Sequence, residues 1–85
     1  MPESNIIVYG TDWCGDCFRT RQFLKRHSIP FTFINIDKNK QAEQLVIQIN
    51  RGMRSVPTIV FSDGMVLTEP SNRELAKKLG VRESF

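Results

Sequence analysis

Both cysteines of the chain, Cys14 and Cys17, lie three positions apart between a predicted strand and a predicted helix. A cysteine in the first turn of a helix faces unpaired backbone N–H groups and the positive end of the helix dipole, which stabilise its thiolate. On that helix Cys17 lies on nearly the same side as Cys14, within disulfide reach. The motif therefore predicts a dithiol that can open and close as a disulfide.

A Cys-x-x-Cys pair is also half of a common zinc site, which needs two further ligands. The chain has no third cysteine and a single histidine, His27. A metal site would therefore need two chains, each donating its pair of cysteines. This metal-bridging binding module stays an alternative, while the redox interpretation predicts no metal ligands.

Length and charge limit the remaining function classes. A chain of 85 residues has room for one small domain, which we place at residues 1–85. The net charge of +3 is dispersed, which argues against nucleic-acid binding, and no apolar run is long enough for a membrane helix. Residues 1–5 show no secretory pattern, so we expect a cytoplasmic monomer with loosely held ends at residues 1–4 and 82–85.

Hydrophobic periodicity predicts the element order β-α-β-α-β-β-α. Strands are expected at residues 5–9, 31–36, 56–61 and 65–67. A first helix is expected at residues 15–27, and a third starts at the capping box of Ser71 and Glu74 and stops at Gly80. The second helix repeats apolar residues at i, i+3, i+4 and i+7, which predicts one buried face made of Ala42, Leu45, Val46 and Ile49. We expect it to cover the sheet face opposite the first helix.

These features resemble the glutaredoxin family of the thioredoxin fold. The resemblance rests on the Cys-x-x-Cys motif after the first strand, Val56-Pro57 before the third, the element order and the length. Within the family, Trp13 directly before Cys14 and the run Arg54-Ser55-Val56-Pro57-Thr58 are similar to the mycoredoxins of actinobacteria. The resemblance covers about the whole chain, and it implies an α/β fold with a four-stranded mixed sheet between helices.

The resemblance also implies an activity and roles for single residues. It implies a reductase of mixed or protein disulfides in which Cys14 is the nucleophile and Cys17 the resolving thiol. Pro57 would form a cis peptide facing the cysteines, and the backbone of Val56 would pair with the bound thiol. No tightly bound cofactor is implied, and a low-molecular-weight thiol, glutathione or mycothiol-like, would serve as co-substrate. Disulfide-bearing proteins would be the partners.

The chain departs from the family pattern at several places, among them Ser55 where Thr is common and the lack of a basic residue just before Cys14, and two departures matter most here. Glutaredoxins commonly have Pro-Tyr between the cysteines, where Gly15-Asp16 stands here. Glutathione-binding members carry Gly-Gly and an aspartate after the fourth strand, where this chain has residues 68–71, Thr-Glu-Pro-Ser. The second departure leaves the identity of the small thiol open.

Three further residues are candidates around the cysteines. Trp13 is either a stacking surface for substrate or a loop aromatic that covers the helix start. Arg54 is a candidate for meeting a carboxylate of the substrate. Asp16 places a carboxylate in the same helical turn as the Cys14 thiolate, and we expect this charge to oppose the thiolate and make the dithiol a stronger reductant.

One redox alternative remains open beside general disulfide reduction. The chain would then be a dithiol donor to a reductase such as ribonucleotide reductase, and a flavoprotein would reduce it. The discriminating observation is whether a small thiol or a flavoprotein restores the dithiol.

Overall fold

The computed structural model describes residues 5–83, so the expectation for residues 1–4 and 84–85 falls outside it. Within this range the predicted element order is confirmed. The elements are β1 (Ile7–Gly10), α1 (Gly15–Arg26), β2 (Thr32–Asn35), α2 (Lys40–Ile49), β3 (Thr58–Val60), β4 (Val66–Thr68) and α3 (Asn72–Leu79). Every predicted strand end was wrong by one or two residues, because regular pairing does not coincide with the apolar runs. β1 is displaced furthest, starting two residues late and including Gly10.

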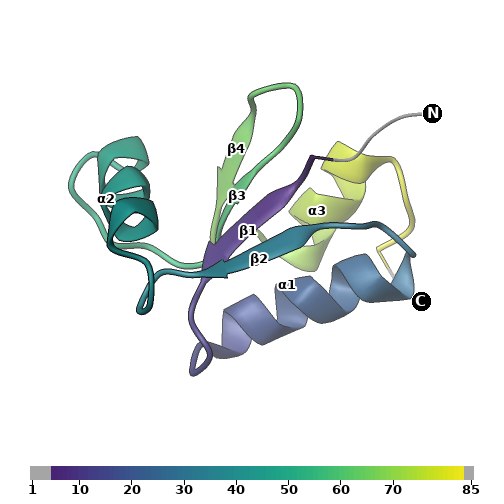
Figure 1. Cartoon of the computed structure of the whole chain (residues 1–85). Coiled ribbons are helices and arrows are strands. Elements are labelled where there is room, and N and C mark those ends of the chain that lie inside the picture. The colour runs from purple at the N-terminus through teal and green to yellow at the C-terminus, as the bar shows by residue number, and fades with distance from the viewer. Residues whose placement is uncertain (1–4, 84–85) are drawn as a thin grey trace.

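The described strands form one mixed sheet in the order β2-β1-β3-β4. β1 pairs with β2 in parallel, and β1–β3 and β3–β4 are antiparallel. α1 makes the crossover between the two parallel strands, and a hairpin joins β3 to β4 (Figure 1). Since α1 follows β1 directly, its first turn lies at the carboxyl end of a central strand.

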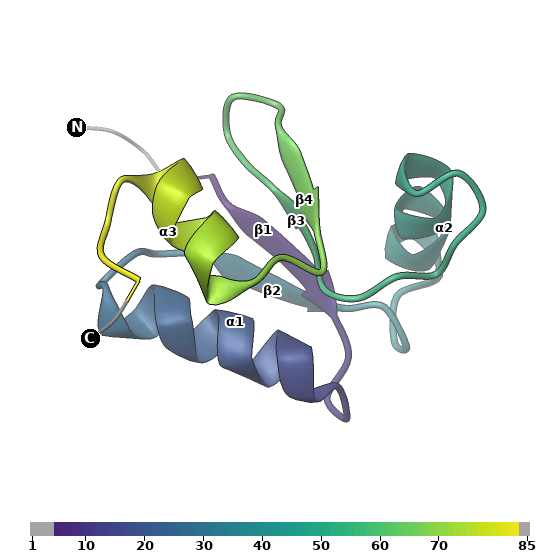
Figure 2. The same ribbon diagram turned by 180° about the vertical axis from the view of Figure 1, so that it is seen from behind.

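Two hydrophobic clusters lie on opposite faces of the sheet. The larger contains side chains of α1, α3, β1 and β3, among them Phe23, Leu75 and Ile59. The smaller joins α2 to the other face through Ala42 and Val46. The ribbon views show α1 and α3 together on one side and α2 on the other (Figures 1 and 2). The fold is therefore the thioredoxin-like α/β arrangement that was expected.

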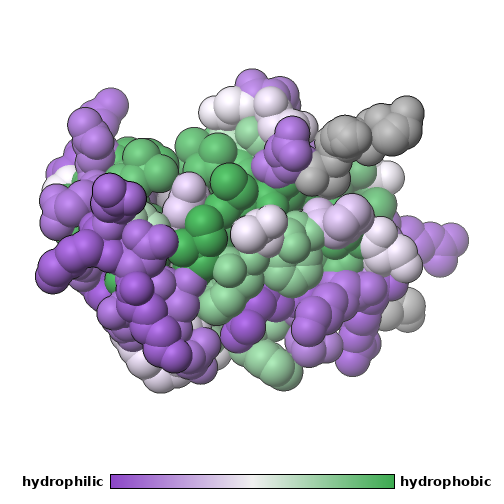
Figure 3. All heavy atoms as spheres, in the orientation of Figure 1, coloured by the Kyte–Doolittle hydropathy of each residue, from purple (hydrophilic) through white to green (hydrophobic). Residues whose placement is uncertain are grey.

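The predicted buried face of α2 is correct at Ala42 and Val46, only half-buried at Ile49, and wrong at Leu45. The Leu45 side chain is 39% exposed. The physical reason is the position of α2, which covers only one end of its sheet face (Figure 1). Hydrophobic side chains remain visible over the middle of this face, beside the hydrophilic outer surface of α2 (Figure 3). Only a narrow strip of the helix is therefore buried.

The third helix has the ends that its sequence predicts. Ser71 accepts a hydrogen bond from the Glu74 N–H at 3.1 Å, and the Glu74 carboxylate accepts one from the Ser71 N–H at 2.9 Å. Gly80 ends the helix in a left-handed conformation, with φ of 69°. These caps fix where α3 begins, and this start lies against α1 through Arg19, which donates to the Pro70 carbonyl and the Asn72 side chain.

Candidate active site

Cys14 is the N-cap residue of α1. Its backbone is extended, and its Sγ accepts a hydrogen bond from the Cys17 N–H at 3.1 Å. The side chain is half-buried, so a substrate sulfur can reach it. The Cys14 sulfur therefore faces the N-terminus of α1, where backbone N–H groups and the positive end of the helix dipole point toward it.

Cys17 has the opposite environment, although it lies only one turn away. It is a free thiol with no exposed surface. Burial and its hydrogen bond to Cys14 raise the pKa of Cys17 from 9.0 to about 12, while a backbone hydrogen bond from Thr11 and the charge of Arg21 act in the other direction. At neutral pH Cys17 therefore holds its proton.

A cis-proline loop faces the cysteines. The Val56–Pro57 peptide bond is cis, as the family resemblance implied, and the Cys14 Sγ lies 3.9 Å from the Val56 carbonyl oxygen. The buried Thr58 hydroxyl donates to the Ser55 carbonyl at 2.8 Å, across the two residues of the cis bond. This hydrogen bond holds the loop in place beside the Cys14 sulfur.

A small polar network ties the loop before Cys14 to α2 and the cis-proline loop. The Trp13 indole N–H donates to Asp37 at 2.8 Å, although the Trp13 side chain is 69% exposed. Arg54 donates to Asp37 at 2.5 Å and to Glu43 at 2.6 Å. Arg54 is thus not a lone charge awaiting a substrate, because two carboxylates of the chain already contact its guanidinium.

Asp16 lies in the first turn of α1, with its carboxylate pointing toward a cation of the same helix. One of its oxygens is 3.5 Å from the Arg19 guanidinium, and the Asp16 side chain is 61% exposed. Water and the Arg19 charge both weaken the field of this carboxylate at Cys14. We therefore expect Asp16 to have a smaller effect on the dithiol than its position in the sequence suggested.

Sequence reasoning missed three residues of this site: Asp37, Arg21 and Gly10. A Cβ atom on Gly10 would lie 2.6 Å from the Cys17 Sγ, so the sulfur packs directly on this glycine. Gly10 is conspicuous at the end of a β-branched run, but nothing in the sequence indicates which side chain approaches it. Asp37 stands in a polar break, where an aspartate has no distinguishing pattern.

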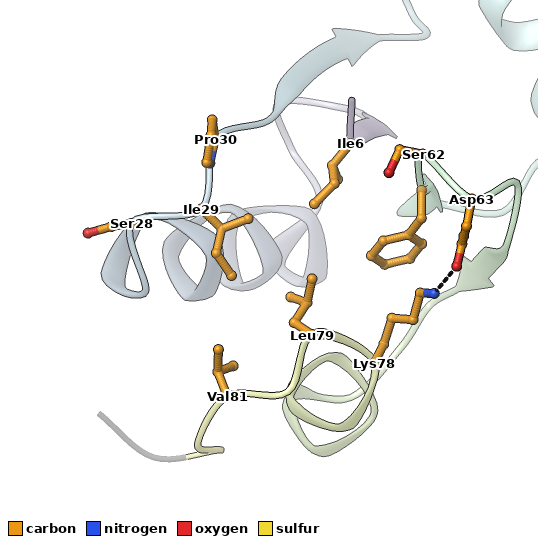
Figure 4. A pocket seen from close by; sticks show the side chains of 10 residues that line it. Ile6, Ser28, Ile29, Pro30, Ser62, Asp63, Lys78, Leu79 and Val81 are labelled. Carbon is orange, nitrogen blue, oxygen red and sulfur yellow. Dashed lines mark hydrogen bonds and ion pairs between the residues drawn. The ribbon is translucent and has the colours of Figure 1, made fainter. Parts of the chain in front are cut away.

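Another hollow in the structure lies away from the cysteines. A groove of about 460 Å³ is bordered by Ile6, Ile29, Phe61 and Leu79, with Lys78 paired to Asp63 at its edge (Figure 4). Ile6 precedes β1, whereas Cys14 follows it, so this groove belongs to the other end of the sheet. In residues 5–83 no group of three or more His, Cys, Asp or Glu side chains is arranged to hold a metal ion. None of the helices in this range is long and apolar enough to cross a membrane.

A mixed sheet of this topology, with a Cys-x-x-Cys pair at a helix N-terminus and a cis-proline beside it, defines a thioredoxin-like thiol–disulfide oxidoreductase. A sequence model of the family described as Glutaredoxin matches residues 6–66, which is more than half of the chain. The protein belongs to the glutaredoxin family.

Curated relatives support the same family over most of the chain. A Mycobacterium tuberculosis protein with a provisional glutaredoxin name is 39% identical over 79 residues, which cover 93% of this chain and 94% of the relative. Mycoredoxin 1 of Corynebacterium glutamicum is 36% identical over 89% of this chain and 94% of its own. The glutaredoxin-like protein NrdH of Lactococcus lactis is 33% identical over 68% of this chain and 78% of its own.

Solved structures agree on the fold. The glutaredoxin of Archaeoglobus fulgidus superposes with a TM-score of 0.70 at 30% identity, over 89% of this chain and 86% of the other. A mutant of a thioredoxin-like protein superposes with a TM-score of 0.81 over 92% of this chain and 97% of its own, at 24% identity. The second likeness concerns the fold alone.

Proposed function

We propose that the protein reduces mixed disulfides or protein disulfides, with Cys14 as nucleophile and Cys17 as resolving thiol. The observation that carries this proposal is the difference between the two sulfurs. Cys14 is half-buried and its sulfur accepts a hydrogen bond from the Cys17 N–H, whereas Cys17 is fully buried and keeps its proton. A substrate sulfur can therefore be attacked by Cys14 and not by Cys17.

The reaction balances with the two thiols alone. The Cys14 thiolate attacks one sulfur of the substrate disulfide, so that a bond to Cys14 forms, the substrate S–S bond breaks and one thiol leaves. Cys17 then loses its proton and attacks the Cys14 sulfur, which releases the second substrate thiol and leaves an oxidised Cys14–Cys17 pair. A second small thiol can also open the mixed disulfide in place of Cys17.

Four residues around Cys14 are proposed to bind the substrate. The Val56 backbone is close enough to the Cys14 sulfur to pair with an extended thiol, and Pro57 holds that backbone in place. Trp13 offers an exposed ring on which a substrate can pack. Arg54 already contacts Asp37 and Glu43, so an acidic group of the substrate would have to bind the same guanidinium beside these two carboxylates.

We propose that the co-substrate is a low-molecular-weight thiol of the glutathione or mycothiol type, used in the cytoplasm for electron transport and redox homeostasis. The similarity to a mycoredoxin supports this proposal. A second candidate is a dithiol donor to a reductase such as ribonucleotide reductase, which the similarity to a glutaredoxin-like NrdH protein favours. The two are distinguished by offering the oxidised protein either small thiols or a thioredoxin-reductase-type flavoprotein.

The test of the proposed roles compares two single-cysteine variants. Cys17→Ser and Cys14→Ser are each incubated with oxidised small thiols, and the adducts are identified by mass spectrometry. We expect Cys17→Ser to hold one adduct on Cys14 and Cys14→Ser to stay unmodified. An equal yield of adduct on Cys17 would contradict the assignment of the nucleophile.

A further inference from the structure

The proposed mechanism leaves Arg21 unused, although its environment is unusual for an arginine. Arg21 follows Cys17 by four residues on α1, so the two side chains lie on one side of the helix. Its guanidinium carbon lies 4.1 Å from the centre of the Phe33 ring. The Arg21 Nε is buried and has no hydrogen-bond partner among residues 5–83, and no carboxylate of this range pairs with Arg21.

Gly10 connects this arginine to the resolving sulfur. A Cβ on Gly10 would lie 2.6 Å from the Cys17 Sγ and 3.0 Å from an edge atom of the Phe33 ring. The sulfur and the ring therefore pack against the same backbone, and Arg21 lies on that ring. The cation is held near Cys17 on a half-buried side chain whose Nε is shielded from water, where a charge acts more strongly than at a fully exposed site.

We propose that Arg21 is a positioning residue for the resolving step, because its charge stabilises the Cys17 thiolate as it forms. This inference rests on the proposed function of the two cysteines. In the step concerned, Cys17 releases its proton to water and its electron pair attacks the Cys14 sulfur. The bond from Cys14 to the substrate sulfur breaks, and the substrate leaves as a thiolate.

The balance of charges around Cys17 explains why such a cation is needed. Burial raises the pKa of Cys17, and the hydrogen bond to Cys14 adds to this, whereas the Thr11 backbone and the Arg21 charge lower it. These groups come from the loop after β1 and from α1. Arg21 is the formal positive charge among them, so it favours ionisation of a thiol that its surroundings otherwise keep protonated.

The test separates the two chemical steps with 2,2′-dithiodipyridine, a neutral disulfide whose released thiol absorbs light. One equivalent of this disulfide is mixed with the reduced protein. The first equivalent of thiopyridone released then reports attack by Cys14, and the second reports resolution by Cys17. Arg21→Gln should leave the first phase unchanged. It should slow the second by about threefold for each pK unit that Cys17 rises, because the lost thiolate fraction outweighs the gained nucleophilicity.

Arg21→Lys and Lys25→Gln are the matched variants. Arg21→Lys keeps the charge and loses the planar stack, so it should restore most of the second phase, and Lys25→Gln removes an exposed charge one turn further along α1 and should change nothing. Between pH 6 and 9, the rate constant of the second phase should be lower in Arg21→Gln than in the native protein by the same factor at every pH.

Two results would overturn the inference. The first is an unchanged second phase in Arg21→Gln. The second is equal slowing in Arg21→Gln and Arg21→Lys, which would show that Arg21 only packs on Phe33. Failure of the proposed function looks different, since the native protein itself would then release no second equivalent of thiopyridone.

Discussion

The indole N–H of Trp13 donates a 2.8 Å hydrogen bond to Asp37, which joins the residue before Cys14 to the loop between β2 and α2. The other oxygen of the same carboxylate accepts from Arg54 in the loop before the cis-proline. Asp37 thus connects two loops that border the Cys14 sulfur.

Trp13 is the only tryptophan of the chain, so its fluorescence reports on the contact with Asp37. Hydrogen bonds from Arg54 and Trp13 hold the pKa of Asp37 below its usual 3.8, so the carboxylate keeps its charge as the pH falls toward that value. We expect the emission to stay constant down to about pH 4 and to change below it.

Asp37→Asn should abolish this acid transition and shift the emission already at neutral pH. Asp63→Asn is the control, because the pKa of Asp63 is also lowered but by Lys78, at the β3–β4 hairpin. A transition that survives in Asp37→Asn would mean that another group reports on Trp13.

Arg54 and Asp37 should have opposite effects on charge selectivity. Arg54→Ala removes a cation beside the cis-proline loop, and we expect the rate with an anionic mixed disulfide to fall by roughly twofold relative to a neutral one. Asp37→Asn frees Arg54 from one of its carboxylates and should raise the same ratio. Both effects should fade with salt. If both variants lower both rates equally at every salt concentration, the network has only a structural role.

Gly10 and Gly15 offer a matched pair of glycine substitutions. Gly10→Ala places a Cβ 2.6 Å from the Cys17 Sγ, and overpacking of this kind costs about 1–3 kcal/mol of the free energy of unfolding. Gly15→Ala meets no atom within 4 Å at the start of α1 and should be neutral or stabilising by up to about 1 kcal/mol. Urea denaturation of the reduced proteins measures both. Equal stability of the two variants would contradict the tight packing of Cys17 on Gly10.

The raised pKa of Cys17 makes stability fall with pH. Below pH 9 the thiol is protonated in both the folded and the unfolded chain, and between 9.0 and about 12 only the unfolded chain loses the proton. The unfolded state is therefore favoured as the pH rises through this window. From pH 8 to pH 10 the free energy of unfolding of the native protein should fall by about 1 kcal/mol more than that of Cys17→Ala, which lacks the thiol. If the free energy of unfolding changed with pH in the same way for both proteins, Cys17 would ionise as readily in the folded state as in the unfolded state.

Asp16 should tune the reduction potential only slightly. Its carboxylate opposes the thiolate of the reduced state, so Asp16→Asn should raise the potential, but the nearby Arg19 and water limit the change to about 10 mV. Equilibration against a redox buffer at low and high salt measures this shift. A lowered potential would show that Asp16 acts by another route, for example by orienting Arg19.

The sequence alone determined the parts of this protein that depend on neighbouring residues. The position of Cys14 at a helix start, the capping box of Ser71 and Glu74, the stop at Gly80 and the order of the elements all follow from patterns a few residues long. Local propensity and periodicity act within that range. The cis geometry at Pro57 followed from the family resemblance and not from local physics.

Only the tertiary structure decided which distant side chains meet around the cysteines. Asp37 contacts Trp13 and Arg54 across 24 and 17 positions of sequence, and Gly10 approaches Cys17 and Phe33 because the sheet and α1 pack together. The exposure of Leu45 likewise depends on how far α2 extends over the sheet. No local pattern specifies such contacts, since they are set by the packing of whole elements, and this packing gives Cys14 and Cys17 their different environments.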